Sequence, residues 1–476
     1  MTKTPAGIAR RLLFLIILTY TMLALAYAYL TPLWQNPDEP AHYNYAREIT
    51  DHVRLPILGP GDYDQQALEQ LKVSKFSGNP DVSRIRYESY QPPLYYLLGA
   101  GVIALTPGVD FDLYAMRLLS VALGALVIIV IFVIAREVVG EDRLVALGAA
   151  GLVAFIPQHM AIAAAANNDA LGELLLALLA IRRMKGLAVR RFVIAGAVLF
   201  GLALLTKLSA YVGVGLLAAG EFGHWWLIDQ RRTRFPLLVG LGVAGGALLI
   251  SGWWFVRNAL VYGNLDVMGL ARHGEVVVGQ PRTLWSLDAL QHLVVTTFQS
   301  FWGIFGWMGV LLDVRIYWLL ALLTLMAVVG LAVFFARTVQ CFCPWQRWAL
   351  AILALQLLFM VGVLVYYNLT FIQPQGRYLF PASAAIGVFL ALGLREMIDR
   401  PAVLAGLSAA GCLVCFLAVR GWFVLGIGLL VVVMIAGAWL FARRCYHLLL
   451  RGGLLGALAV LDLVSLLLFI VPALTS

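Results

Sequence analysis

Apolar runs long enough to cross a lipid bilayer as helices recur from one end of this chain to the other. The first is unbroken from Leu12 to Leu30 and follows Arg10 and Arg11. A spanning helix needs about 20 mainly apolar residues, whereas the apolar part of a secretory signal is shorter. This run therefore predicts an uncleaved first transmembrane helix. With 62% hydrophobic and 12% charged residues, the whole chain falls in the membrane class of proteins.

The same length criterion predicts an all-α, polytopic membrane fold with about thirteen transmembrane helices. The predicted spans lie near residues 10–31, 113–138, 144–166, 168–182, 191–206, 208–227, 235–255, 315–336, 347–368, 377–395, 402–419, 422–442 and 453–473. Two other apolar segments, 92–106 and 287–310, are interrupted by prolines, glycines or polar residues. We predict that these two lie at the membrane interface.

Clusters of basic residues set the predicted orientation. They are Arg182, Arg183, Lys185, Arg190 and Arg191, then Arg231, Arg232 and Arg234, then Arg443 and Arg444. All of these clusters become cytoplasmic if the N-terminus is cytoplasmic, as the positive-inside rule favours. The net charge of +9 is thus explained by topology, and no nucleic-acid partner is expected. We expect a multi-pass protein of the plasma (inner) membrane with its C-terminus outside.

Two long loops, 32–112 and 256–314, then fall on the extracytoplasmic side. Loops of this length are usually functional or disordered, and the Tyr, Trp and Pro content here argues against disorder. None of the five cysteines lies in either loop, so a disulfide framework is not expected. The active face is therefore predicted to be extracytoplasmic.

Asp38, Glu39 and His42 follow the first predicted span directly. Adjacent carboxylates can serve as a general base and as a metal ligand or orienting group, and His42 lies one helical turn beyond Asp38. A simpler interpretation is that the two acids only stabilise a helix N-terminus that begins after Pro37.

Two further polar motifs precede later spans on the same side. The first, Tyr90-Gln91-Pro92-Pro93-Leu94-Tyr95-Tyr96, closes the acidic loop, although interface tyrosines are common in membrane proteins. The second, Asn167-Asn168-Asp169, can bond sugar hydroxyls or can simply cap a helix.

Three cations lie at the outer ends of predicted helices. These are Lys207, Arg257 and Arg377, with Asn258, Gln375 and Tyr378 beside the two arginines. A lone cation can snorkel to the interface. Three cations on the side that the positive-inside rule disfavours indicate an anionic ligand, for which a phosphate at the membrane surface is suitable.

In their order and spacing these motifs resemble the GT-C superfamily of polytopic glycosyltransferases, in the branch of protein mannosyltransferases and lipid A aminoarabinose transferases. The matching segments are residues 37–42, 91–96, 167–170, 201–207, 254–258, 262–263 and 375–378. Residues 300–303 and 305–307 are similar to those of a related branch of predicted bacterial membrane proteins. The resemblance covers residues 1–395, and 396–476 are predicted to add C-terminal transmembrane helices.

The resemblance implies transfer of a sugar from a polyprenyl-phosphate carrier to an extracytoplasmic glycan, lipid or protein, with inversion at the anomeric carbon. Asp38 would be the base, with Glu39 as the second catalytic carboxylate. His42, Tyr95, Asn167, Asn168, Asp169, Lys207, Arg257, Asn258, Gln375, Arg377 and Tyr378 would bind donor, phosphate or acceptor. Glu39 and His42 would either orient Asp38 or hold a divalent metal ion, which is an optional cofactor.

Two alternatives to this interpretation remain. A transporter or flippase of a lipid-linked or anionic substrate would also need a polar site in the membrane, but such sites usually lie at the midplane between inverted repeats. A catalytically silent scaffold with the same fold is the second, because fold alone does not fix function.

Overall fold

The computed structural model is almost entirely helical. It describes residues 5–475 except 79, 141, 185–188, 224, 227–233, 279–285, 371, 401–402, 407 and 410–445. In chain order its elements are α1 (Ala6–Leu30), α2 (Glu39–His52), α3 (Gln65–Val73), α4 (Leu94–Ile103), α5 (Val109–Val139), α6 (Arg143–Ala154), α7 (Pro157–Ala163), α8 (Asp169–Met184), α9 (Val189–Leu204), η1 (Leu208–Tyr211), α10 (Val212–Gly223), α11 (Phe235–Tyr262), α12 (Leu270–His273), η3 (Gly274–Val278), α13 (Leu287–Gly303), β1 (Ile304–Phe305), β2 (Val310–Leu311), α14 (Val314–Val333), η4 (Phe334–Thr338), η5 (Val339–Cys341), α15 (Pro344–Thr370), η6 (Gly376–Ala382), α16 (Ser383–Ile398), α19 (Tyr446–Val464), η7 (Ser465–Ile470) and α20 (Val471–Thr475).

Within the described residues, seven helices are long and apolar enough to cross a membrane. They are Ala6–Leu30, Phe111–Val139, Pro236–Tyr262, Val314–Cys341, Pro344–Leu369, Gly376–Ile398 and Leu450–Thr475. Shorter apolar helices cover Leu94–Ile103, Arg191–Leu204 and Leu208–Gly223. The prediction of a multi-pass all-α membrane protein is confirmed. The total of thirteen spans stays a prediction, since 402–419 and 422–442 lie almost wholly outside the described residues.

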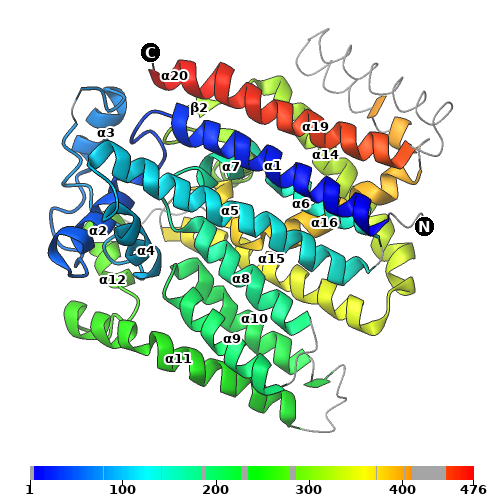
Figure 1. The fold of residues 1–476 in the computed structure, drawn as a ribbon, viewed down its shortest axis with the longest axis horizontal. Coiled ribbons are helices and arrows are strands. Elements are labelled where there is room, and N and C mark those ends of the chain that lie inside the picture. The colour runs from blue at the N-terminus through cyan, green and yellow to red at the C-terminus, as the bar shows by residue number, and fades with distance from the viewer. Residues whose placement is uncertain are drawn as a thin grey trace.

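Glycines allow the central helices to approach closely. The central group is α1, α5, α6, α8, α14 and α16, which pack against one another in Figure 1. A Cβ atom added to Gly393 of α16 would lie 1.9 Å from the Ala327 carbonyl oxygen of α14, and one on Gly330 would lie 2.0 Å from the Gly393 carbonyl oxygen. Because lipid supplies no hydrophobic force between helices, such close backbone contact is a main source of their association.

A second group of helices, α9, α10 and α11, lies along the lower edge of the bundle in Figure 1. Its apolar centre joins α9 to α11 and consists of Phe192, Phe200, Leu204, Val239, Val243 and Ala247. The helix α11 continues to Tyr262, beyond the predicted end of that span at residue 255. As a result Arg257 lies within the helix.

The predicted single span 144–166 is in fact broken. Its two parts, Arg143–Ala154 and Pro157–Ala163, meet at an angle of 67°. Pro157 occupies the first turn of α7, and Ile156 before it is extended. Proline disfavours helical geometry in the preceding residue, which explains the break.

The helices α2, α3, α4 and α12 gather at one end of the bundle, which we call the Asp38 end (Figure 1). The chain begins at the opposite end and finishes near the Asp38 end. An odd number of crossings requires such an arrangement. The helix α5 has 31 residues and would measure about 45 Å along its axis. This one helix is therefore long enough to connect the two ends.

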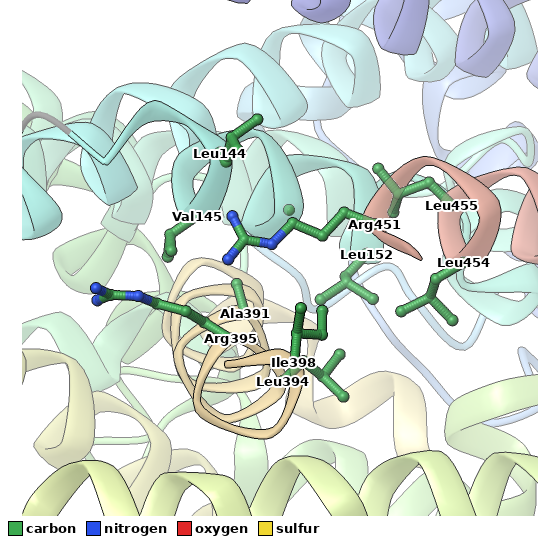
Figure 2. A pocket seen from close by; sticks show the side chains of 11 residues that line it. Leu144, Val145, Leu152, Ala391, Leu394, Arg395, Ile398, Arg451, Leu454 and Leu455 are labelled. Carbon is green, nitrogen blue, oxygen red and sulfur yellow. The ribbon is translucent and has the colours of Figure 1, made fainter. Parts of the chain in front are cut away.

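At the opposite end, the small pocket of Figure 2 lies between α6, α16 and α19. Its lining is apolar apart from Arg395 and Arg451. Both guanidinium groups contact Asp142, at 3.3 and 4.0 Å respectively. These ion pairs stabilise the packing of the start of α19 against the central helices.

We predict that Gly393→Ala lowers the free energy of unfolding by about 1–3 kcal/mol, because the added methyl group would force α14 and α16 apart. Gly362→Ala is the matched control, since it makes the same change in α15, where no atom lies within 4 Å of the added Cβ. Thermal unfolding of both variants in detergent measures the difference. Equal midpoints would contradict the proposed close packing.

Candidate functional site

Asp38 lies in the short link between α1 and α2, at the N-cap of α2. Its backbone is left-handed, with φ of 67°, a conformation that is uncommon for residues other than glycine. The Asp38 carboxylate accepts a hydrogen bond from the Tyr87 hydroxyl at 2.7 Å and pairs with the Arg377 guanidinium. Its side chain remains 19% exposed. The fold therefore brings a partly accessible carboxylate to a cation from 339 residues further along the chain.

The surroundings of Asp38 favour its charged form. Burial opposes ionisation, but the charge of Arg377 and the hydrogen bond from the Tyr87 hydroxyl lower the pKa of Asp38 to about 2. Asp38 is therefore a carboxylate at neutral pH.

Glu39, the next residue, faces a different partner. Its carboxylate accepts two hydrogen bonds of 2.7 Å from Arg117 of α5, and both side chains are completely buried. The other guanidinium bonds run to the carbonyl oxygens of Ala28, Thr31 and Pro32. The five N–H donors of Arg117 are therefore all used, and Glu39 belongs to a structural ion pair beneath Asp38.

His42 lies one turn into α2, among aromatic rings. Its Nδ1 atom is 2.9 Å from the Tyr96 hydroxyl, and the Tyr96 ring stacks on Tyr45 with centroids 3.7 Å apart. Burial lowers the pKa of His42 to about 3, although the nearby Asp38 opposes this shift. The imidazole is therefore neutral and can act as a ligand or hydrogen-bond partner.

Glu88 is a member of the site that sequence reasoning did not single out. One ligand atom from each of Asp38, His42 and Glu88 lies within 4.8 Å of the others. The Glu88 Oε2 atom is buried and has no hydrogen-bond partner in the described part of the chain. Burial, together with the charge of Asp38, raises the pKa of Glu88 to about 7. The predicted metal ligand Glu39 is not in this group.

The motif Asn167-Asn168-Asp169 joins the site from the start of α8. Asp169 pairs with Lys207, with Nζ and Oδ1 2.5 Å apart. Asn168 donates to the Tyr96 hydroxyl and to the Thr206 carbonyl oxygen, and its own Oδ1 has no partner among the described residues. Asn167 accepts a bond from the Asp169 backbone N–H, which is a capping interaction. The local hydrogen-bonding interpretation therefore applies to Asn167, and sugar binding by this motif stays a prediction.

In the motif Gln375-Gly376-Arg377, the glycine position has no room for a side chain. A Cβ atom on Gly376 would lie 2.3 Å from the Phe301 nitrogen of α13, and the Gly376 N–H donates to Ser300 Oγ at 2.8 Å. Arg377 is thereby held at the Asp38 carboxylate. Its Nε is buried and has no hydrogen-bond partner within the described ranges. This atom is an available donor beside Asp38.

Other predicted residues have partners of their own. The Tyr95 hydroxyl bonds Ser120 at 2.9 Å in the buried core. Arg257 donates to the Pro56 carbonyl oxygen and lies over the Trp254 ring. Asn258 donates to the Val267 carbonyl oxygen. These contacts join helices or loops around the site, and the structure shows no contact from any of the three to Asp38.

Gln375 and Tyr378 lie on either side of Arg377. Gln375 precedes the first residue of η6, and its carbonyl oxygen accepts from the Tyr378 N–H. The Tyr378 hydroxyl donates to Gln373 Oε1 at 2.7 Å, while its ring lies 5.5 Å from the Arg377 guanidinium carbon. Tyr378 therefore forms one wall beside the cation.

Comparison with known families gives one partial match. The family described as dolichyl-phosphate-mannose-protein mannosyltransferase matches residues 90–255, which is less than half of the chain. This segment includes Tyr95, Asn167, Asn168, Asp169 and Lys207. No curated protein matches the chain significantly.

Solved structures resemble nearly the whole chain. The crystal structure of ArnT from Cupriavidus metallidurans bound to undecaprenyl phosphate matches with a TM-score of 0.54 and covers 99% of this chain and 77% of that one. The apo structure of ArnT matches with a TM-score of 0.52 and covers 97% of this chain and 76% of that one. Both are 17% identical to this chain in sequence. The Archaeoglobus fulgidus oligosaccharyltransferase in the apo form, 13% identical, gives 0.48 and covers 88% of this chain and 54% of that one.

At this level of identity the two ArnT structures establish the fold. The chain thus shares the fold of ArnT, and residues 90–255 match the mannosyltransferase family.

Proposed function

We propose that this protein is an inverting glycosyltransferase that moves a sugar from a polyprenyl-phosphate carrier to the hydroxyl group of a glycan, lipid or protein. The observation that carries the proposal is the pairing of an ionised, partly exposed Asp38 with a buried Arg377 whose Nε donor is free among the described residues. A base and an anion-binding donor thus lie side by side. The ArnT structure of the same fold was solved with undecaprenyl phosphate.

In the proposed reaction Asp38 acts on the acceptor hydroxyl, and the cations act on the leaving phosphate. Asp38 accepts the proton of the acceptor hydroxyl while that oxygen bonds the anomeric carbon and the bond from that carbon to the lipid phosphate breaks. Arg377 and Lys207 offset the charge of the departing phosphate, where low polarity strengthens their effect. A phosphate leaving group needs no protonation to depart. One carboxylate in this role is therefore enough for a single displacement with inversion.

The low pKa of Asp38 makes it a weak base as the structure stands. A donor phosphate that pairs with Arg377 would weaken the ion pair between Arg377 and Asp38. The carboxylate then loses its main stabilising charge, and its basicity rises. In this proposal the donor activates the base that acts on the acceptor.

A divalent metal ion fits the residues Asp38, His42 and Glu88. The fit rests on the unpaired, buried Glu88 oxygen and on the neutral imidazole, since oxygen and imidazole donors suit such ions. The ion would supply additional positive charge facing the donor phosphate. Glu88 therefore replaces Glu39 in our proposed ligand set.

We assign the site to the extracytoplasmic face of the plasma membrane. The support is topological: the Asp38 end is opposite to the end where the chain begins with Arg10 and Arg11. The positive-inside rule favours a cytoplasmic position for those arginines.

We predict that Asp38→Asn lowers kcat for sugar transfer by roughly 100-fold or more, because the amide cannot accept the proton. Purified protein in nanodiscs would be supplied with undecaprenyl phosphate carrying radiolabelled sugars, one sugar at a time, and sugar release measured. Asp81→Asn is the control: it makes the same change on an exposed residue of the same loop and should retain activity. Equal release by both variants would exclude Asp38 as the base. Movement of labelled lipid between leaflets without sugar release would favour a flippase.

We predict that Glu39→Gln destabilises the protein by about 3–5 kcal/mol, because it leaves the Arg117 guanidinium buried without a counter-charge. Glu69→Gln is the matched control. In its salt bridge to Lys72 the Glu69 side chain is 55% exposed, so the pair should contribute below about 1 kcal/mol. Thermal unfolding in one detergent compares the two variants. If Glu39→Gln unfolds at the temperature of the control, the buried pair is not the anchor that we describe.

We predict that Mn²⁺ raises the unfolding temperature of the wild type and that Glu88→Gln abolishes this increase, because a ligand that binds only the native state stabilises it. Glu69→Gln should respond as the wild type does. A response retained by Glu88→Gln would remove Glu88 from the proposed ligand set.

A further inference from the structure

A carboxylate without a partner lies inside one of the membrane-spanning helices. Asp462 belongs to α19, near the middle of the candidate span Leu450–Thr475, and none of its surface is exposed. Neither carboxylate oxygen has a hydrogen-bond partner within the described residues. Ionisable residues at such depth are costly and are usually retained for a function.

Among the described residues, the neighbours of Asp462 offer oxygen atoms and no positive charge. From α1, Tyr27 donates its hydroxyl to the Asp462 carbonyl oxygen at 2.8 Å, and the Tyr20 hydroxyl interacts electrostatically with Asp462. From η7, the hydroxyl of Ser465 lies against Tyr27. Tyr20 and Ser465 are completely buried, and their hydroxyl oxygens are unpaired in the part of the chain that is described.

In the part of the chain that the structure describes, no charged or titratable group around this cluster neutralises it. Glu173 of α8 acts electrostatically on Tyr20, and His159 of α7 is held 3.2 Å from both Glu173 oxygens. The described cation on the same helix, Arg451, is eleven residues away, about 16 Å along the axis, and contacts Asp142. An unpaired carboxylate in this position would carry a large desolvation penalty.

We propose that Asp462 and Ser465, which lie three residues apart along one helical segment, form an intramembrane binding site for one monovalent cation, either a proton or a sodium ion. One carboxylate balances a single positive charge, which disfavours a divalent ion. The three side-chain oxygens of Asp462 and Ser465 are the donor type that hard cations prefer. The π-helical turn η7, which begins at Ser465, is a local distortion of a kind frequent at functional sites.

This site is separate from the proposed transferase centre and does not depend on it. It lies where Tyr27 of α1 bonds α19, and these two helices lie side by side in Figure 1. The cation therefore stabilises the packing of the last described span against the first. Because the site lies between helices, its effect on stability can be measured without any sugar donor.

The test is labelling by dicyclohexylcarbodiimide, which modifies protonated carboxyl groups in apolar surroundings. Full-length protein in nanodiscs would be labelled from acidic to alkaline pH, in choline chloride or in sodium chloride at equal ionic strength. The modified residue is identified by peptide mass spectrometry. Asp462→Asn is the variant, and the exposed Asp313 is the internal control.

In choline chloride we expect labelling at Asp462 and none at Asp313. Labelling of Asp462 should fall on the order of tenfold per pH unit above the pH at which its carboxyl group loses the proton. Protection by sodium identifies a sodium site, and labelling that sodium leaves unchanged identifies a proton site. No labelling of Asp462 at any pH in choline chloride would overturn the proposal.

A second measurement keeps the proposal testable if the reagent cannot reach the site. The unfolding temperature of the wild type should depend on pH or on sodium, whereas Asp462→Asn should fold and lose that dependence, because the amide needs no cation. The same pH and sodium response in both proteins would overturn the proposal.

Discussion

The buried ion pair between Arg117 and Glu39 fixes the geometry on which the site depends. Three of the five guanidinium donors bind carbonyl oxygens at the end of α1 and just beyond it, where a helix leaves such groups without partners. The other two hold the first residue of α2. One side chain of α5 therefore sets the positions of two helix ends. Asp38 lies in the link between them, so its position follows from this pair.

The other cations differ from Arg117 in how completely they are bonded. Arg117 has no free donor, and Arg257 donates to the Pro56 carbonyl oxygen while its guanidinium lies over an aromatic ring. Arg377 keeps an unpaired Nε, and Lys207 is 17% exposed at its side chain. Arg117 and Arg257 hold segments of the fold together, whereas Arg377 keeps one donor without a partner among the described residues and Lys207 stays partly accessible. This difference in contacts, which charge alone does not reveal, is why we propose phosphate binding by Arg377 and Lys207.

Much of the fold could be predicted from hydropathy, since a chain in lipid must satisfy its backbone hydrogen bonds internally and therefore forms helices. The break at Pro157 and the extension of α11 to Tyr262 depend on local geometry that apolar length does not report. Asp38, His42, Lys207 and Arg377 could be proposed because polar motifs at helix ends are unusual in an apolar chain.

The remaining site residues carried no such signal. Arg117 stands inside an apolar run, where a single charge resembles an interface residue, and Glu88 is one of many acids in the first loop. Glu39 differs from Asp38 by one position and one methylene group. Only the left-handed backbone at Asp38 turns the two carboxylates towards different partners, and that conformation is set by tertiary contacts.

The helix α1 connects the two polar regions of the molecule. Its last carbonyl groups are held by Arg117 beneath Asp38, while Tyr20 and Tyr27 contact the Asp462 region. The packing of α19 on α1 and the link that positions Asp38 therefore depend on the same helix. The two regions are chemically independent, but they share one rigid element.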